Sequence, residues 1–130
     1  MKSPVYFIDL RTDAKENLTA KLNRLLDAVS LASVIRPHEL IAVKMHFGER
    51  GNTAFIRPIF IRDIVQKIIA CGGSPFLTDT NTLYRGERCD AVSHQRLAIE
   101  HGFSFAAIGA PIIIADGVRG NTFRRVKIEG

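Results

Sequence analysis

The chain has 130 residues, of which 46% are hydrophobic and 24% charged, and it carries a formal net charge of +5 at pH 7. This composition excludes a disordered tail and a collagen-like repeat, and the length suits one domain, expected over residues 1–130. The cationic surplus favours an anionic partner, although a basic surface that only keeps the protein soluble explains it equally well.

Cysteine usage and the apolar runs limit the compartment and the cofactors. Only Cys71 and Cys89 are present, and they form no C-x-x-C pair. No cofactor is therefore expected in this chain, because a zinc or iron–sulfur site needs more thiolates. Two unpaired thiols favour a reducing, cytoplasmic compartment. No signal peptide begins the sequence, and the longest apolar run, 110–115, is far shorter than the ~20 residues of a membrane helix, so no membrane partner is expected.

The first 30 residues predict a strand and a helix. Residues 5–8, Val-Tyr-Phe-Ile, form an apolar run typical of a buried strand. Asp13 and Glu16 have the spacing of a capping box, which predicts the start of a helix. Leucines at helical spacing follow from Leu18 onward, so we expect one face of this helix to pack on a sheet.

Two more strand–helix units follow along the chain. Residues 40–43 predict a second buried strand, and Pro58 has the fixed backbone angle that suits a first helical position. Gly72 and Gly73 predict the end of that helix, because glycine adopts the left-handed conformation there. Residues 75–77 predict a short third strand.

The C-terminal third predicts a helix, a strand and an arm. Asp90 is the expected cap of the third helix. The helix carries the apolar residues Val92, Leu97 and Ile99, and its histidines, His94 and His101, are expected at the surface or in packing. Residues 112–114 predict a fourth strand, and the alternation over 122–128 predicts a hairpin arm exposed on one face.

Alternating strands and helices predict the fold class. Such a pattern forms βαβ units with a mostly parallel sheet, and nearly continuous apolar strands favour burial on both faces. The expected fold is an open, three-layer, Rossmann-like α/β domain with a C-terminal hairpin arm. The order of its strands stays open.

The ends of the predicted strands indicate where a ligand binds. Open α/β sheets bind ligands beyond the carboxyl ends of their strands. The predicted strands end at Asp9, Lys44, Asp79 and Asp116. We therefore expect Lys44, Asp79 and Asp116 to be neighbours at the mouth of one cavity, although they are far apart in the sequence.

The loops after these strands are rich in cationic and amide side chains. Such groups form charge-assisted hydrogen bonds to carboxylates and phosphates, which favours a small anionic ligand. The expected ligand-binding residues are Lys44, Asn52, Arg57, Thr80, Asn81, Arg85 and Arg119. Arg88 has the same chemistry. The alternative is that some arginines pair with Asp79, Asp116 and Glu87 and only hold the loops together.

Acid–base or metal chemistry is the second possibility at this edge. The candidate catalytic residues are His46, Asp79 and Asp116. With Glu49, they are also a weakly specified nitrogen and oxygen donor set for a metal ion, although aspartates at strand ends often cap the next helix. No Walker A or G-x-G-x-x-G element is present, and no reaction class follows from these residues.

The basic arm is the feature that relates to nucleic acid. Its cations are Arg119, Arg124, Arg125 and Lys127, with Phe123 among them. A solvated outer face explains the same residues, so nucleic acid is not the expected partner.

Three long motifs carry a resemblance to a known family. They are VKMHFGERGNT (43–53), FLTDTNTLYRG (76–86) and GAPIIIADG (109–117). In this order, the sequence closely resembles the uncharacterised iron–sulfur-centre proteins, a domain of unknown function often fused to a ferredoxin-type module. All three motifs lie in the strand-end segments described above.

The resemblance implies that this chain corresponds to the N-terminal portion of a longer architecture. Longer members continue with a second α/β half and with cysteine-rich segments similar to four-iron, four-sulfur ferredoxins, and an iron–sulfur cluster is implied only for them. We therefore expect an α/β domain of a redox-associated iron–sulfur protein that binds a small anionic ligand at the strand ends. The alternative is a non-catalytic interaction domain that docks a redox partner or a second copy of itself.

Overall fold

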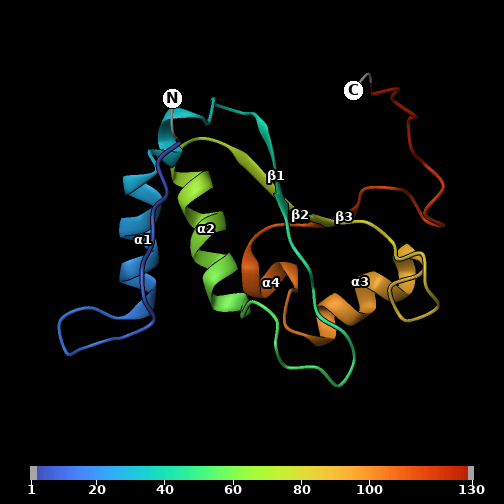
Figure 1. Cartoon of the computed structure of the whole chain (residues 1–130), viewed down its shortest axis with the longest axis horizontal. Coiled ribbons are helices and arrows are strands. Elements are labelled where there is room, and N and C mark those ends of the chain that lie inside the picture. The colour runs from blue at the N-terminus through green and yellow to red at the C-terminus, as the bar shows by residue number, and fades with distance from the viewer. Residues whose placement is uncertain (1–2, 129–130) are drawn as a thin grey trace.

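The computed structural model describes residues 3–128 (Figure 1). Its elements in chain order are α1 (Leu18–Ala28), the 3-10 helix η1 (Leu31–Ser33), β1 (Leu40–Lys44), α2 (Pro58–Ala70), β2 (Ser74–Asp79), α3 (Ala91–Glu100), α4 (Phe105–Ile108) and β3 (Ile112–Ile114). The strands form one parallel sheet in the order β1-β2-β3. This confirms the open α/β class and the parallel sheet. No helix within residues 3–128 is both long and apolar enough to cross a bilayer.

Local sequence signals explain where α2 and α3 begin. Pro58 is the first residue of α2, where its missing N–H leaves no hydrogen bond unmade. Gly72, with φ +86°, follows the last turn of α2 in the left-handed conformation. The side chain of Asp90 accepts hydrogen bonds from the backbone N–H groups of Val92 and Ser93 and so caps α3. These three predictions are confirmed.

The start of α1 differs from the predicted capping box. Asn17 is the N-cap, and its Oδ1 accepts a hydrogen bond from Ala20 N at 2.9 Å. Asp13 Oδ1 instead accepts from the N–H groups of Lys15 and Glu16, which closes a separate turn before the helix. The leucines of α1 pack on α2 rather than on the sheet, and none of them is fully buried.

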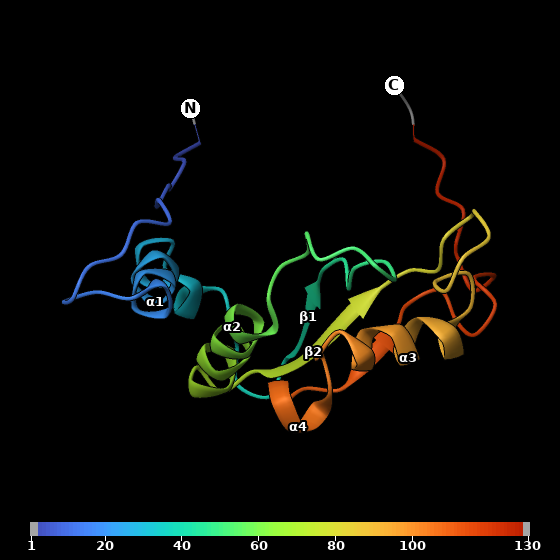
Figure 2. The ribbon, with the colours of Figure 1, turned by 90° about the horizontal axis from the view of Figure 1, so that it is seen from below.

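The helices that build the core lie on one face of the sheet (Figures 1 and 2). Leu77 of β2 and Ile114 of β3 form one hydrophobic cluster with residues of α2, α3 and α4, among them Val65 and Ile108. The expected third layer is not present among the described residues, because Leu40 and Ile113 on the opposite face remain exposed. The buried face extends to the carboxyl end of β2, where the polar site begins.

Both terminal segments remain outside the sheet. Residues 5–8 and 122–128 form no strand, so the predicted first strand and the hairpin arm are wrong. Val5 and Phe7 are 90% and 87% exposed, and Phe123 is also exposed. An apolar run becomes a strand only where a neighbouring strand accepts its backbone hydrogen bonds, and within residues 3–128 no strand pairs with these segments.

Candidate functional site

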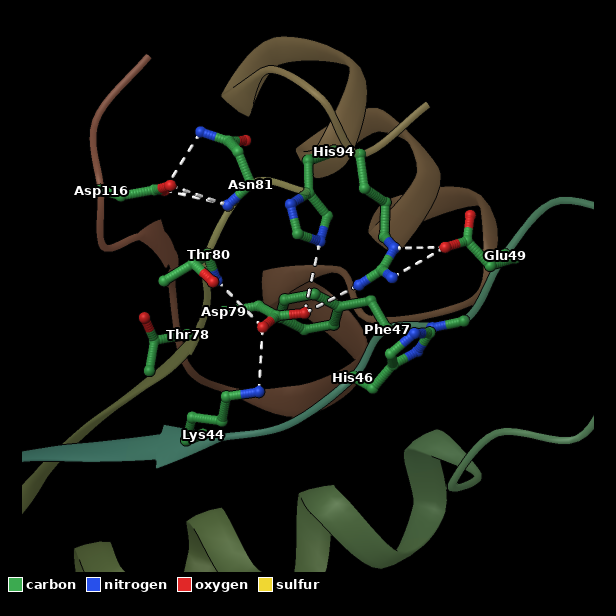
Figure 3. Close-up of polar contacts among 12 residues, drawn as sticks. Lys44, His46, Phe47, Glu49, Thr78, Asp79, Thr80, Asn81, His94 and Asp116 are labelled. Carbon is green, nitrogen blue, oxygen red and sulfur yellow. Dashed lines mark hydrogen bonds and ion pairs between the residues drawn. The ribbon is translucent and has the colours of Figure 1, made fainter. Parts of the chain in front are cut away.

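Lys44 and Asp79 meet at the carboxyl ends of β1 and β2 (Figure 3). The parallel register pairs Lys44 with Thr78, the residue before Asp79. Lys44 Nζ lies 3.0 Å from Asp79 Oδ1. The side chain of Lys44 is 68% exposed and that of Asp79 only 6%, so a buried carboxylate holds an ammonium group that faces solvent.

Three other groups lie close to the carboxylate of Asp79. The backbone N–H of Thr80 donates to Oδ1 at 2.9 Å, and Arg88 Nη1 donates to Oδ2 at 3.1 Å. His94 Nε2 lies 3.7 Å from the same Oδ2. The buried carboxylate is therefore compensated by two cations, one exposed (Lys44) and one buried (Arg88).

Arg88 links the loop after β1 to the loop after β2. Its Nε and Nη2 lie 2.8 Å and 2.7 Å from Glu49 Oε1, while its Nη1 contacts Asp79. Tyr84 donates its hydroxyl hydrogen to Glu49, and this bond, followed by Arg88, lowers the pKa of Glu49. Arg88 thus has the loop-holding role that the sequence left open, and Arg50 pairs similarly with Glu87.

His94 is fully buried on α3 behind Asp79. Its ring meets the edge of Phe47 at a centroid distance of 5.7 Å, and neither ring nitrogen has a hydrogen-bond partner within residues 3–128. Burial lowers the pKa of His94, and the charge of Asp79 opposes this only in part. The imidazole is therefore neutral at pH 7.

Sequence reasoning expected His94 to be a surface or packing residue and assigned it no site role. Val92 and Ile99 are exposed, whereas Ala91, His94 and Leu97 are buried. These three follow one another at i, i+3 and i+6 after the cap Asp90. That spacing was the available signal, and the preference for large apolar residues concealed it.

Asp116 fastens the loop after β2 to the loop after β3. Its carboxylate accepts hydrogen bonds from Asn81 N at 3.0 and 3.1 Å and from Asn81 Nδ2 at 3.1 Å. The same Nδ2 also donates to Gly117 O at 2.8 Å. Lys44, Asp79 and Asp116 lie at the same edge of the sheet (Figure 3), but the polar contacts of Asp116 differ from those of Asp79.

A cavity of about 370 Å³ lies beside the loop after β1. It is lined by His46, Asn52, Ala54, Phe55 and Ile56. His46 Nδ1 accepts a hydrogen bond from Gly48 N at 2.9 Å, so the neutral ring carries its hydrogen on Nε2. Asn52 Oδ1 accepts from Ala54 N, which leaves the NH₂ group of Asn52 as a donor.

The expected cationic residues are not gathered at one point. Arg57 precedes α2 and lines a different cavity, together with Asn17 near the start of α1. Arg85 and Arg119 are exposed in the loops after β2 and β3, and Thr80 is exposed directly after Asp79. Of this set, the structure places Lys44 and Thr80 in contact with Asp79.

Comparison with known protein families assigns the chain to one of them. The model of a family described as Domain of unknown function (DUF362) matches residues 41–130. The chain belongs to this family. The DUF362 region begins within β1 and contains every loop of the site, whereas α1 precedes it. Neither the curated proteins nor the solved structures contain a match to the chain.

The candidate metal ligands of this DUF362 domain do not come together. Among residues 3–128 no three His, Cys, Asp or Glu side chains are close enough to hold a metal ion. Glu49 contacts Arg88 and Tyr84, and Asp116 contacts Asn81. The two cysteines are free, with Cys71 at the end of α2 and Cys89 exposed before α3, so they do not fit an iron–sulfur cluster.

Proposed function

We propose that this DUF362 domain binds a small organic anion at the carboxyl edge of its sheet, with Lys44 as the main cation. The observation that carries the proposal is the exposed ammonium of Lys44, held 3.0 Å from the buried carboxylate of Asp79. An ammonium group has three N–H donors, and Asp79 accepts only one of them. The other two N–H groups face solvent from a fixed position, so less side-chain entropy of Lys44 is lost when a ligand binds.

The cavity beside His46 supports a ligand with an uncharged body. His46 follows Lys44 by two residues, just beyond the end of β1, and both residues are exposed. His46 Nε2 and the Asn52 amide supply hydrogen-bond donors, and Phe55 supplies an apolar wall. These groups suit a carboxylate or phosphate that carries a small planar or apolar group.

The other expected residues keep secondary roles in this proposal. Thr80 and Arg85, on the loop after β2, and Arg119, after β3, extend the same edge and add donors to a larger anion. Asn81 and Asp116 bond to each other and so fix the loops. The proposal covers binding alone, and His46 is the exposed candidate for proton transfer.

A substitution of Lys44 tests the proposal. Lys44→Met removes the charge and keeps the aliphatic stem, and Arg96→Met, at an exposed position of α3, is the matched control. Small carboxylates, inorganic phosphate and phosphate esters are titrated while the melting temperature is recorded, because a ligand specific to the native state raises it. We expect a saturable rise in the wild type and in Arg96→Met, and none in Lys44→Met with unchanged circular dichroism. If no compound raises the melting temperature, or if Lys44→Met responds like the wild type, the proposal is rejected.

The resemblance to iron–sulfur-centre proteins supports a redox context for this binding. In that context, a ligand held at Lys44 is the molecule that a cluster on another part of a longer protein reduces or oxidises. The two free cysteines fit the reducing, cytoplasmic compartment that we propose for this protein.

A docking domain is the second candidate function, and exposed apolar side chains favour it. Val5, Phe7, Phe123 and Ile128 are largely solvent-exposed on the two extended terminal segments. A docking role predicts that the wild type associates with itself or with a ferredoxin-like partner in sedimentation experiments. Phe7→Ser and Phe123→Ser are then expected to weaken association without changing anion binding. If the wild type sediments as a monomer and does not associate with such a partner, this function is excluded.

A further inference from the structure

An apolar cavity of about 230 Å³ lies between the N-terminal segment, α1 and α2. Its walls include Ile8 and Leu10 before α1, Leu18 and Leu22 of α1, and Phe60 and Ile64 of α2. Ile56 is the one residue that it shares with the cavity beside His46. A cavity with walls of this kind gives water few hydrogen bonds and favours an apolar occupant.

A charged cavity of about 360 Å³ adjoins the apolar one. Both are bordered by Asp9 and Lys21, whose side chains form an ion pair at 2.7 Å. The charged cavity is also lined by Arg11, Thr12, Asp13, Glu16 and Arg24. An aliphatic compartment and a charged compartment therefore meet at Lys21.

We propose that these adjoining cavities bind an amphiphile with one short aliphatic chain and an anionic head group. The chain occupies the space between Leu22 and Phe60, and the head replaces the carboxylate of Asp9 on Lys21. Methylene groups and water molecules are similar in size, at roughly 30 Å³ each, so 230 Å³ accommodates about eight carbons. Octanoate is accordingly the probe of matching length.

The ion pairs around Lys21 determine which carboxylate is displaced. Arg24 makes two hydrogen bonds of 2.9 Å to Glu16, and Asp13 accepts from backbone N–H groups. Asp9 is more easily displaced, because its side chain is 48% exposed and its other contacts, to Arg11 N at 3.3 Å and to Arg11 Nε at 3.9 Å, are long. Lys21 is only 14% exposed and stays at the mouth of the apolar cavity.

Two matched probes and two charge variants test the proposal. Octanoate and 1-octanol each contain eight carbons and differ mainly in the charge of the head group, and their binding is measured by calorimetry. We expect Lys21→Met to weaken octanoate binding about threefold to fivefold and Asp9→Asn to strengthen it by a similar factor, since an exposed pair has this strength. The affinity for 1-octanol is expected to stay unchanged in both variants.

A cavity-filling variant tests the apolar compartment. Leu22→Trp places an indole in the cavity and is expected to weaken both probes at least about tenfold, and Leu22→Phe serves if the larger residue unfolds α1. Ile69→Trp, at an exposed position of α2 outside the cavity, is the control and retains binding.

Several results overturn the proposal. The first is the absence of saturable binding of either probe to the wild type. The second is binding of the probes to Leu22→Trp with the same affinity as to the wild type. The third is an affinity for octanoate that is unchanged in both Lys21→Met and Asp9→Asn. Stabilisation by Leu22→Trp without any probe binding identifies the space as a packing gap. None of these outcomes involves Lys44, so they are independent of the anion site at the sheet edge.

Discussion

Asp79 and Arg88 form an ion pair at 3.1 Å in which both side chains are almost wholly buried. Arg88 also binds Glu49, and Asp79 also binds Lys44. One buried guanidinium therefore fixes two carboxylates, that of Glu49 in the loop after β1 and that of Asp79 at the end of β2, and Asp79 positions the exposed ammonium of Lys44. The geometry of the proposed anion site depends on Arg88, although Arg88 itself faces no solvent.

Removing Arg88 is expected to destabilise the fold strongly. Arg88→Met leaves the carboxylates of Asp79 and Glu49 without their buried partner, which typically costs about 3–5 kcal/mol in the free energy of unfolding. Urea denaturation followed by circular dichroism measures this. Arg50→Met is the control, because Arg50 pairs with Glu87 and Glu100 on the surface and such pairs contribute at most about 1 kcal/mol. Equal midpoints for the two variants would contradict a structural role for Arg88.

His94 is expected to make the protein less stable in mild acid. Burial lowers the pKa of His94 in the folded state below its ordinary value of 6.5. As the pH decreases, the unfolded chain is therefore protonated at His94 before the folded chain is. The free energy of unfolding therefore falls as the pH decreases from about 6.5 toward the lowered pKa, and levels off below it for this group.

The variant His94→Leu isolates this contribution. At pH 7.5 its free energy of unfolding is expected within about 1 kcal/mol of the wild type, because two nitrogens without partners are removed. Between pH 7 and pH 5 the variant is expected to lose less stability than the wild type in parallel urea titrations. Identical slopes with pH would show that His94 is protonated equally in both states.

Two glycines of the loop after β1 make a matched pair for a packing prediction. Gly48 and Gly51 both have positive φ, +96° and +79°, so a side chain costs about 1 kcal/mol at either position. A Cβ at Gly48 would also lie 2.7 Å from His101 Nδ1 and from the ring of Phe55, whereas a Cβ at Gly51 meets nothing within 4 Å.

Gly48→Ala is therefore expected to destabilise the protein more than Gly51→Ala, by roughly a further 1–3 kcal/mol. Because His101 and Phe55 stack at a centroid distance of 4.6 Å, the clash displaces a wall of the cavity beside His46. Thermal denaturation of both variants measures the difference. Similar melting temperatures would indicate that the loop moves freely around Gly48.

The sequence predicted the elements that have strong local signals. Pro58 and Asp90 each start a helix through chemistry that acts within one turn, and the three β-strands contain apolar runs that pair with one another in the sheet. Residues 5–8 have an equally apolar run and form no strand, because strand formation depends on a partner that local sequence does not encode. The apolar residues of α3 alone do not identify its buried face for a related reason, since His94 is buried there while Val92 is exposed.

Topology also explains why part of the site was foreseen. Parallel strands place Lys44 and Asp79 at one edge whatever the side-chain details, and these two residues are in contact. Side-chain partners depend on loop paths, which the sequence does not specify. Arg57 consequently lies beside α1, and Arg88, expected to face a ligand, instead binds Asp79 and Glu49.

The packing of α1 leads to a final prediction about local stability. None of its residues is fully buried, it contacts α2 rather than the sheet, and it lies outside the region that matches the family. Helices with few buried side chains open without unfolding of the whole domain. Amide hydrogen exchange is therefore expected to be faster over residues 18–28 than over 58–70.

Asn17→Ala removes the cap that binds Ala20 N, worth about 1 kcal/mol, and is expected to accelerate exchange only in α1. Asp90→Ala removes the cap of α3, whose residues enter the core, so the same loss is expected to lower the global unfolding midpoint and to accelerate exchange throughout the core. A global shift with Asn17→Ala would show instead that α1 unfolds together with the core.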